Sequence, residues 1–143
     1  MSWEEHQPRE RARLVEAQLV RGTDNLAQAE VVLEWRAVEY RGRASDVGLG
    51  TMDLRVCALA TLDALQQLLG ERTSLRLVGV KSIKAFDDTV AIVAVSAHDP
   101  IAKEERRLVG TSPVPEGDTP TGVARALLNA TNRLFGNFLS VGD

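Results

Sequence analysis

The chain has 143 residues, of which 44% are hydrophobic and 26% charged, with a formal net charge of −3 and a pI near 5.4. This length suits one compact domain or two small halves that share a core, and the composition is that of a folded globular protein. The acidic balance argues against nucleic acid as a partner, because phosphate-binding domains carry a basic surface. The single cysteine, Cys57, excludes an internal disulfide, and no apolar run approaches the roughly 20 residues that cross a membrane.

Residues 1–12 are charged, acidic near their start and interrupted by Pro8. A signal peptide has the opposite order, with basic residues followed by an apolar stretch. We therefore expect residues 1–12 to be a polar lead-in, the protein to be cytoplasmic, and no membrane to be a partner. Residues 13–143 are expected to form a single duplicated domain, with halves at about residues 13–72 and 73–139.

The first half has the pattern of three strands and a helix. Residues 14–21 suit a strand, and residues 22–25 (GTDN) have the chemistry of a turn. Residues 27–35 and 38–45 alternate apolar and polar side chains with a period of two, which predicts half-buried strands. An amphipathic helix is expected from about Met52 to Gly70, since glycine favours the left-handed conformation that ends many helices. Its apolar stripe consists of Ala58, Leu62, Leu65 and Leu69.

The second half follows the same order. Strands are expected at residues 74–86 and 89–97, with a turn at Asp87 and Asp88, and a third strand at residues 103–112 after a loop at 98–101. A loop at residues 113–118 then leads into a helix over residues 119–139. Asp118 or Thr119 can cap this helix, and Pro120 suits its first turn.

The two expected helices also match in sequence. A shift of 66 residues overlays ALATLDALQQLL on ARALLNATNRLF, and it pairs Asp63 with Asn129 and Gln66 with Asn132. The matched apolar positions are Ala58, Ala60, Leu62, Ala64 and Leu68 with Ala124, Ala126, Leu128, Ala130 and Leu134. Repetition of both the element order and the helix stripe predicts an α+β fold. We expect two βββα units related by an internal pseudo-twofold axis, with helices packed on antiparallel sheet.

The strand at residues 90–95 is apolar on both of its alternating faces. A sheet with helices on one side and water on the other normally shows polar residues on the second face. The second face is therefore expected to be covered, either by other parts of the chain or by a second copy. This pattern predicts a homodimer.

The duplicated βββα order resembles the C-terminal regulatory domain of 2-isopropylmalate synthase over about residues 13–139. That domain carries a Gly-x-Gly-Pro-Val-Asp-Ala motif before its first helix. Here GLGTMDL keeps Gly48, Gly50 and Asp53, with other residues in place of Pro, Val and Ala. DDTVAIVAV is similar to the start of the family's second unit, and LLNATNRL is similar to its last helix.

The resemblance implies a non-catalytic, allosteric domain. In the synthase this domain follows a catalytic barrel, and the inhibitor leucine binds between regulatory domains. A chain of this length is too short to hold such a barrel as well, so we expect a stand-alone regulatory or ligand-sensing domain. Its ligand would be a small amino acid or a related metabolite, and no cofactor is expected.

The expected ligand site is the pair of segments that lead into the two helices. Backbone amides at a helix start attract a carboxylate, and an aspartate beside them can hold an ammonium group. The candidate residues are Gly48, Gly50, Thr51, Asp53, Asp118 and Thr119. The alternative is a tight strand-to-helix connection in which Asp53 or Thr51 caps the helix, with no ligand.

Other polar groups have simpler interpretations. Asp87 and Asp88 are more consistent with a hairpin turn than with a metal-binding or acid–base pair. His98 and Asp99 resemble a catalytic dyad, but a loop position and the lack of a placed nucleophile argue against catalysis. His6 is a poor metal partner, so no metal site is expected, and Cys57 is expected to be a buried thiol.

Three alternatives to a ligand-sensing function remain open. The fold could be a dimerisation platform that binds a protein partner without any ligand. It could be an RNA-associated module, since double-stranded RNA-binding domains also end in three strands and a helix. The final helix here begins GDTPTGVAR and lacks the lysines that such domains place there. An enzyme is the least expected class.

Overall fold

A computed structural model describes residues 11–99 and 101–141. The expected lead-in and His6 lie outside the described residues. The elements are β1 (Arg13–Arg21), β2 (Leu26–Trp35), β3 (Val38–Val47), α1 (Met52–Leu69), β4 (Leu75–Ala85), β5 (Asp88–Asp99), β6 (Glu104–Pro113) and α2 (Thr119–Val141).

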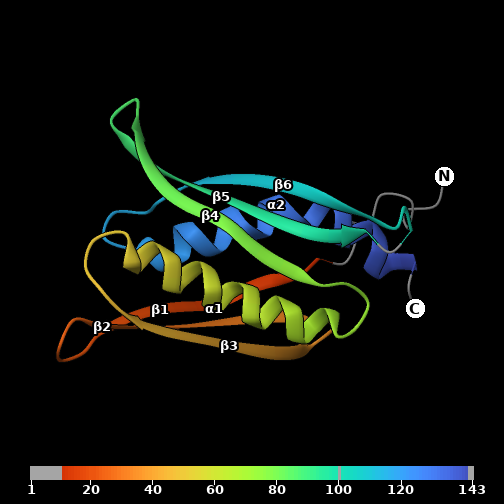
Figure 1. Cartoon of the computed structure of the whole chain (residues 1–143), viewed down its shortest axis with the longest axis horizontal. Helices are drawn as coiled ribbons and strands as arrows, with labels where there is room; N and C mark the ends of the chain where they lie inside the picture. The colour runs from red at the N-terminus through yellow and green to blue at the C-terminus, as the bar shows by residue number, and fades with distance from the viewer. Residues whose placement is uncertain (1–10, 100, 142–143) are drawn as a thin grey trace.

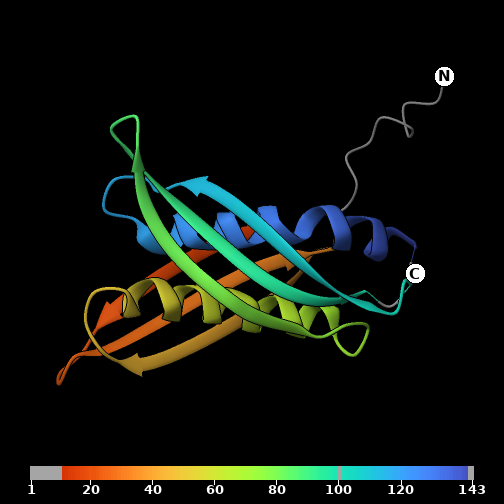
Figure 2. The ribbon, with the colours of Figure 1, turned by 45° about the horizontal axis from the view of Figure 1, so that its top comes forward.

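The molecule has two antiparallel three-stranded sheets with both helices between them (Figure 1). Sheet orders are β1-β2-β3 and β4-β5-β6, so each unit forms its own sheet. Helix α1 contacts β2, β3 and also β4, while α2 contacts β5, β6 and also β1. Figure 2 shows the two helices running side by side and starting at the same end of the molecule. The predicted α+β fold of two βββα units is confirmed.

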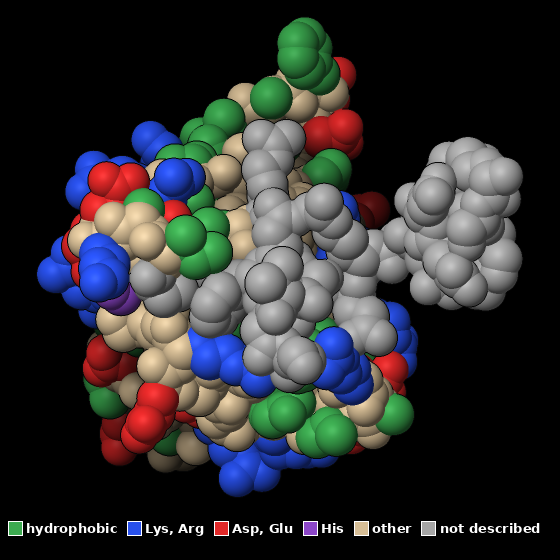
Figure 3. All heavy atoms as spheres, turned by 90° about the vertical axis from the view of Figure 1, so that its right-hand side faces the viewer, with side chains coloured by type: hydrophobic (Ala, Val, Ile, Leu, Met, Phe, Trp, Pro, Cys, Tyr) green, Lys and Arg blue, Asp and Glu red, His purple; other side chains and the backbone are tan. Residues whose placement is uncertain are grey.

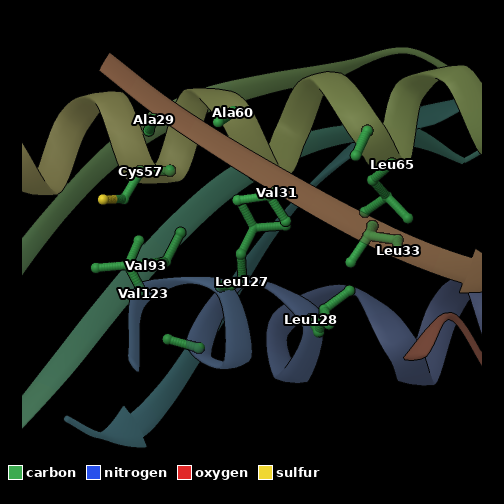
Figure 4. Close-up of a cluster of buried hydrophobic side chains, with 14 of the residues drawn as sticks. Ala29, Val31, Leu33, Cys57, Ala60, Leu65, Val93, Val123, Leu127 and Leu128 are labelled. Carbon is green, nitrogen blue, oxygen red and sulfur yellow. The ribbon is translucent and has the colours of Figure 1, made fainter. Parts of the chain in front are cut away.

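One hydrophobic core lies between the sheets and joins both units. The inward-facing side chains of β2 and β5 meet the buried faces of α1 and α2 there (Figure 4). Fully buried members from the four elements include Val31, Leu33, Leu65, Val93 and Leu127. Because each helix touches the sheet of the other unit, neither half buries its apolar surface alone.

A glycine in each sheet lets a helix approach the strand backbone directly. A Cβ atom on Gly42 of β3 would lie 2.0 Å from the carbonyl oxygen of Ala60 and 2.4 Å from the backbone nitrogen of Ala64 in α1. A Cβ atom on Gly110 of β6 would lie 2.1 Å from the carbonyl oxygen of Ala126 in α2. Any side chain at these positions would push the helix off the sheet, so the contact requires glycine.

Two further details repeat in both units. The β1–β2 register shifts between Leu14 and Glu16, and the β4–β5 register shifts between Leu77 and Gly79, so each first strand has a bulge at the corresponding place. One residue beyond each glycine, a helix side chain binds the strand. Asp63 accepts a 3.0 Å hydrogen bond from the Arg43 amide, and Asn129 donates a 2.8 Å hydrogen bond to the Thr111 carbonyl.

Two expected connections are wrong in detail. The β4–β5 turn is formed by Phe86 and Asp87, with φ of 53° and 68°, while Asp88 begins β5. Aspartate favours turns, but the strand register decides which residues form this one. Because Ala85 pairs with Asp88, only Phe86 and Asp87 are left between the strands. His98 and Asp99, expected in a loop, continue β5 because they pair with residues of β6.

We predict that Gly42→Ala and Gly110→Ala each lower the free energy of unfolding by about 1–3 kcal/mol, because the methyl group overpacks a helix–strand contact. Gly79→Ala is the matched control, since a Cβ atom at this strand glycine meets nothing within 4 Å. Urea unfolding of the three variants measures the difference. Equal stability of all three would contradict the close-approach interpretation.

Candidate functional site

A cavity of about 490 Å³ opens where the two helices begin. We call it the helix-start mouth. Its lining comes from the edge strand β1, the first turn of α1 and the segment that enters α2. The lining residues are Ala17, Gln18, Leu19, Val20, Asp53, Gly117, Asp118, Thr119 and Pro120. Three of the sequence-predicted site residues, Asp53, Asp118 and Thr119, are therefore brought together although 65 or more positions separate Asp53 from the others.

Asp118 lines the mouth and caps the start of α2. Its carboxylate accepts a 3.2 Å hydrogen bond from the Thr121 amide and a 2.7 Å hydrogen bond from the Thr121 hydroxyl. This is the N-cap arrangement that an aspartate before a helix favours, with Thr119 and Pro120 already in the first turn. The expected cap is thus Asp118 rather than Thr119.

Asp53 does not cap α1, contrary to one of the expected alternatives. The N-cap position is Thr51, which makes no side-chain capping hydrogen bond. Asp53 instead forms an ion pair with Arg21 at the end of β1. The same guanidinium donates hydrogen bonds to the carbonyl of Asn25 at 3.2 Å and of Gly48 at 2.6 Å. Arg21 therefore ties the end of β1, the β1–β2 turn and the start of α1 together.

Gly48, Gly50 and Thr51 lie in the connection that leads from β3 into α1. They are not among the residues that line the mouth. The Gly48 amide donates a 3.0 Å hydrogen bond to the Asn25 carbonyl, which holds the connection against the neighbouring turn. Gly50 has a φ of 63°, a left-handed conformation that explains its glycine. The Gly48 carbonyl also holds the Arg21 guanidinium, and on this side of the mouth the lining comes from β1.

Strand β1 supplies the part of the mouth that sequence reasoning missed. It pairs only with β2, so alternate backbone N–H and C=O groups point away from the sheet. Residues 17–20 line the mouth along this free edge, close to the start of α2. The sequence holds no signal for this contribution, because a backbone edge has no characteristic side chain.

Cys57 lies buried one turn into α1, as expected. Burial raises the pKa of its thiol to about 12, and the nearby Asp53 and Asp118 carboxylates add to the rise. The thiol therefore stays protonated, and it belongs to the hydrophobic core.

The remaining polar clusters are separate from the mouth. His98 and Asp99 do not form a dyad: the His98 Nδ1 atom lies 3.7 Å from Glu105, while Asp99 forms a 3.0 Å ion pair with Arg106. Hydrogen bonds from the Ala102 and Ile101 amides, together with Arg106, lower the pKa of Asp99. Asp99 thus stabilises the β5–β6 connection.

A second hollow, of about 530 Å³, lies over the outer face of the first sheet. Its centre is Glu30, which is bound by Arg43 and Arg41 from the neighbouring strand. The Arg43 hydrogen bond is the largest influence that lowers the pKa of Glu30. The charges of Glu30, Arg41 and Arg43 therefore satisfy one another in this hollow.

Within residues 11–99 and 101–141, no cluster of three or more His, Cys, Asp or Glu side chains is arranged to hold a metal ion. None of the helices described is both long and apolar enough to pass through a bilayer. Comparison of the sequence with protein-family models and with curated proteins gives no match. The resemblance to the regulatory domain of 2-isopropylmalate synthase remains a prediction from the sequence.

We predict that Arg21→Ala lowers the free energy of unfolding by about 1–2 kcal/mol, because it removes charge-assisted hydrogen bonds to two carbonyls and an ion pair. Amide exchange at Gly48 should also become faster. Arg13→Ala is the matched control on the same strand, since Arg13 forms a single exposed ion pair with Glu34 and such pairs contribute little. Equal effects of the two changes would show that Arg21 is not a structural tie.

We predict that a thiol reagent at mildly alkaline pH labels Cys57 slowly in the native protein and rapidly in urea. The folded thiol keeps its proton up to about pH 12, against an ordinary pKa of 9.0. The unfolded thiol ionises first, so the free energy of unfolding falls as the pH rises between these values, and Cys57→Ala should lack this decline. Rapid native labelling would mean that the α1 start opens readily.

Proposed function

We propose that this protein is a non-catalytic, small-ligand-sensing regulatory module that acts as a homodimer and binds an amino acid or related metabolite at the helix-start mouth. The observation that carries the proposal is the convergence of Asp53, Asp118 and Thr119 on one cavity at the starts of both helices. The predicted resemblance to a regulatory domain of 2-isopropylmalate synthase points to the same class of function.

The chemistry of the mouth suits a zwitterion. The starts of α1 and α2 carry partial positive charge, which favours a carboxylate group. The Asp53 and Asp118 carboxylates and the free carbonyl groups of β1 favour an ammonium group. A volume of about 490 Å³ lies in the range that encloses small molecules, typically about 300–1,000 Å³.

A sensing role suits this site better than catalysis. Asp53 is bound by Arg21, and Asp118 caps α2, so both carboxylates already have structural partners. When a residue both stabilises the fold and contacts a ligand, binding of the ligand affects the packing of the elements that this residue connects. Ligand bound there would fix the α1 and α2 starts relative to β1, which is a structural change that a partner can detect.

Nucleic acid is a less suitable partner. On the end of the molecule in Figure 3, Lys and Arg side chains are mixed with Asp and Glu side chains. Mixed charge of this kind gives little net attraction for a phosphate backbone. The RNA-associated alternative predicts retention of generic RNA on a filter at low salt.

The second candidate is a dimerisation platform without a ligand. It is favoured by the apolar outer surface of the second sheet, where Ile83 and Val109 are exposed. On this hypothesis the mouth is only a junction between secondary-structure elements. The two candidates differ in what small molecules do to stability.

We predict that at least one compound in a panel of amino acids and keto acids raises the melting temperature, because a ligand that binds only the folded state stabilises it. A rise of about 2–4 °C corresponds to about 1 kcal/mol for a domain of nearly 150 residues. Asp53→Asn and Asp118→Asn should abolish the rise. Asp46→Asn is the control, since Asp46 is an exposed strand residue away from the mouth lining.

Melting without any compound gives the baseline for each variant, which separates lost binding from lost folding. A compound that stabilises the wild type and all three variants equally would bind elsewhere. Absence of a shift with every compound, together with a firm dimer by light scattering, would favour the platform.

A further inference from the structure

The outer face of the second sheet carries an apolar surface that is interrupted where Lys81 and Thr111 flank Ile92 in register. Paired rows across β4, β5 and β6 place Ile83 beside Val90, Ile92 at the centre, and Ala94 beside Val109. The bulged Val78 adds to it, and Val78, Ile83 and Val109 are 42%, 43% and 59% exposed. We call Val78, Ile83, Val90, Ile92, Ala94 and Val109 the apolar face. Within the residues described, no other segment covers it.

The corresponding surface of the first sheet is charged. The position that matches Ile92 in the centre of the sheet is Glu30, which is bound by Arg41 and Arg43. The one outward valine of β2, Val32, is only 1% exposed and pairs in register with Glu16 and Arg41. The two units share their inner faces but differ on the outside, so the apolar face is not a consequence of the fold itself.

A projecting hairpin extends the apolar face. The β4–β5 turn reaches beyond the helices at one end of the molecule (Figures 1 and 2). Phe86 at its tip is 99% exposed, and its φ of 53° is an unfavourable conformation for a bulky residue. The hairpin register imposes this conformation, and the fully exposed ring at the tip is apolar area that a second molecule can bury next to the apolar face.

We propose that the apolar face and Phe86 form the contact with a second copy of this chain. This goes beyond the proposed function, because it states where the two copies meet. Strands of 10–12 residues with ordinary spacing cover on the order of 500 Å². A buried phenylalanine adds about 200 Å². The sum approaches the roughly 800 Å² per partner of a specific interface.

The surface that covers the apolar face is the same face of the second copy. The charged outer face of the first sheet would lose water from Glu30, Arg41 and Arg43 if it met the apolar face, which is unfavourable. The surface of a second copy that best matches the apolar face is therefore the same face. Such a contact is isologous and closes as a twofold dimer. Lys81 lies opposite Ile92 on the same face. Because it belongs to the edge strand β4, its ammonium group can remain in water at the rim of the interface.

The test is the dimer dissociation constant of the full chain, measured by sedimentation equilibrium. We expect Val109→Lys, which buries an unpaired charge, to weaken dimerisation about 100-fold or more, and Ile92→Glu, whose carboxylate would lie opposite Lys81, to weaken it less. Phe86→Ser should weaken it less, because it removes one contact. Val47→Lys is the matched control: Val47 is a strand valine of the first unit with the same exposure of 59%, and its variant should dimerise like the wild type.

Circular dichroism of each variant, including the milder Val109→Thr, confirms that the monomer is folded. A monomeric wild type would overturn the proposal, and so would a dimer that Ile92→Glu and Val109→Lys leave intact. In the second case the copies meet elsewhere and the homodimer of the proposed function survives. Ligand-induced melting shifts are measured independently, so failure of the interface and failure of the sensing function are distinguishable.

Discussion

The whole structure depends on the direct contact between a helix backbone and a strand glycine, made once in each unit. Gly42 and Gly110 allow α1 and α2 to lie on their sheets at a distance that excludes even a methyl group. The alanines at 60, 64, 126 and 130 are the helix side of the same constraint, since larger side chains there would separate the layers. With both helices held this close, two helices fit side by side between two sheets and share one core. The two units therefore depend on each other, because each leaves a helix face that the other unit covers.

The same contact determines where chemistry is possible. Helices of similar origin that lie side by side in the same direction begin at the same end of the molecule (Figure 2). Asp118, which caps α2, and Asp53, which pairs with Arg21, thus line one cavity at the starts of both helices. The lining of this cavity comes from two halves that are far apart in the chain.

Much of the fold was predictable because burial imposes a period on the sequence. The alternation in residues 27–35 and the alanine–leucine stripes of the helices gave the strands, the helices and their repetition. The sequence pattern placed Asp53, Asp118 and Thr119 among the candidate site residues for one reason. Each lies just before or within the first turn of a helix. It did not indicate Arg21 or the edge of β1, because an ion pair across 32 positions and a backbone edge have no local pattern. The turn at Phe86 and Asp87 was misplaced because strand register, rather than the turn preference of aspartate, decides which residues take positive φ.

The bulges in β1 and β4 have a consequence for the behaviour of the chain in concentrated solution. An open sheet edge is a template for strand addition, and a duplicated protein with two small sheets has four such edges. Here the edges of β3 and β6 are bound by helix side chains, Asp63 and Gln67 in one case and Asn129 in the other. The other two edges carry the bulges and are flanked by α2 and α1. The helix side chains and the bulges thus hinder the addition of another strand along these edges.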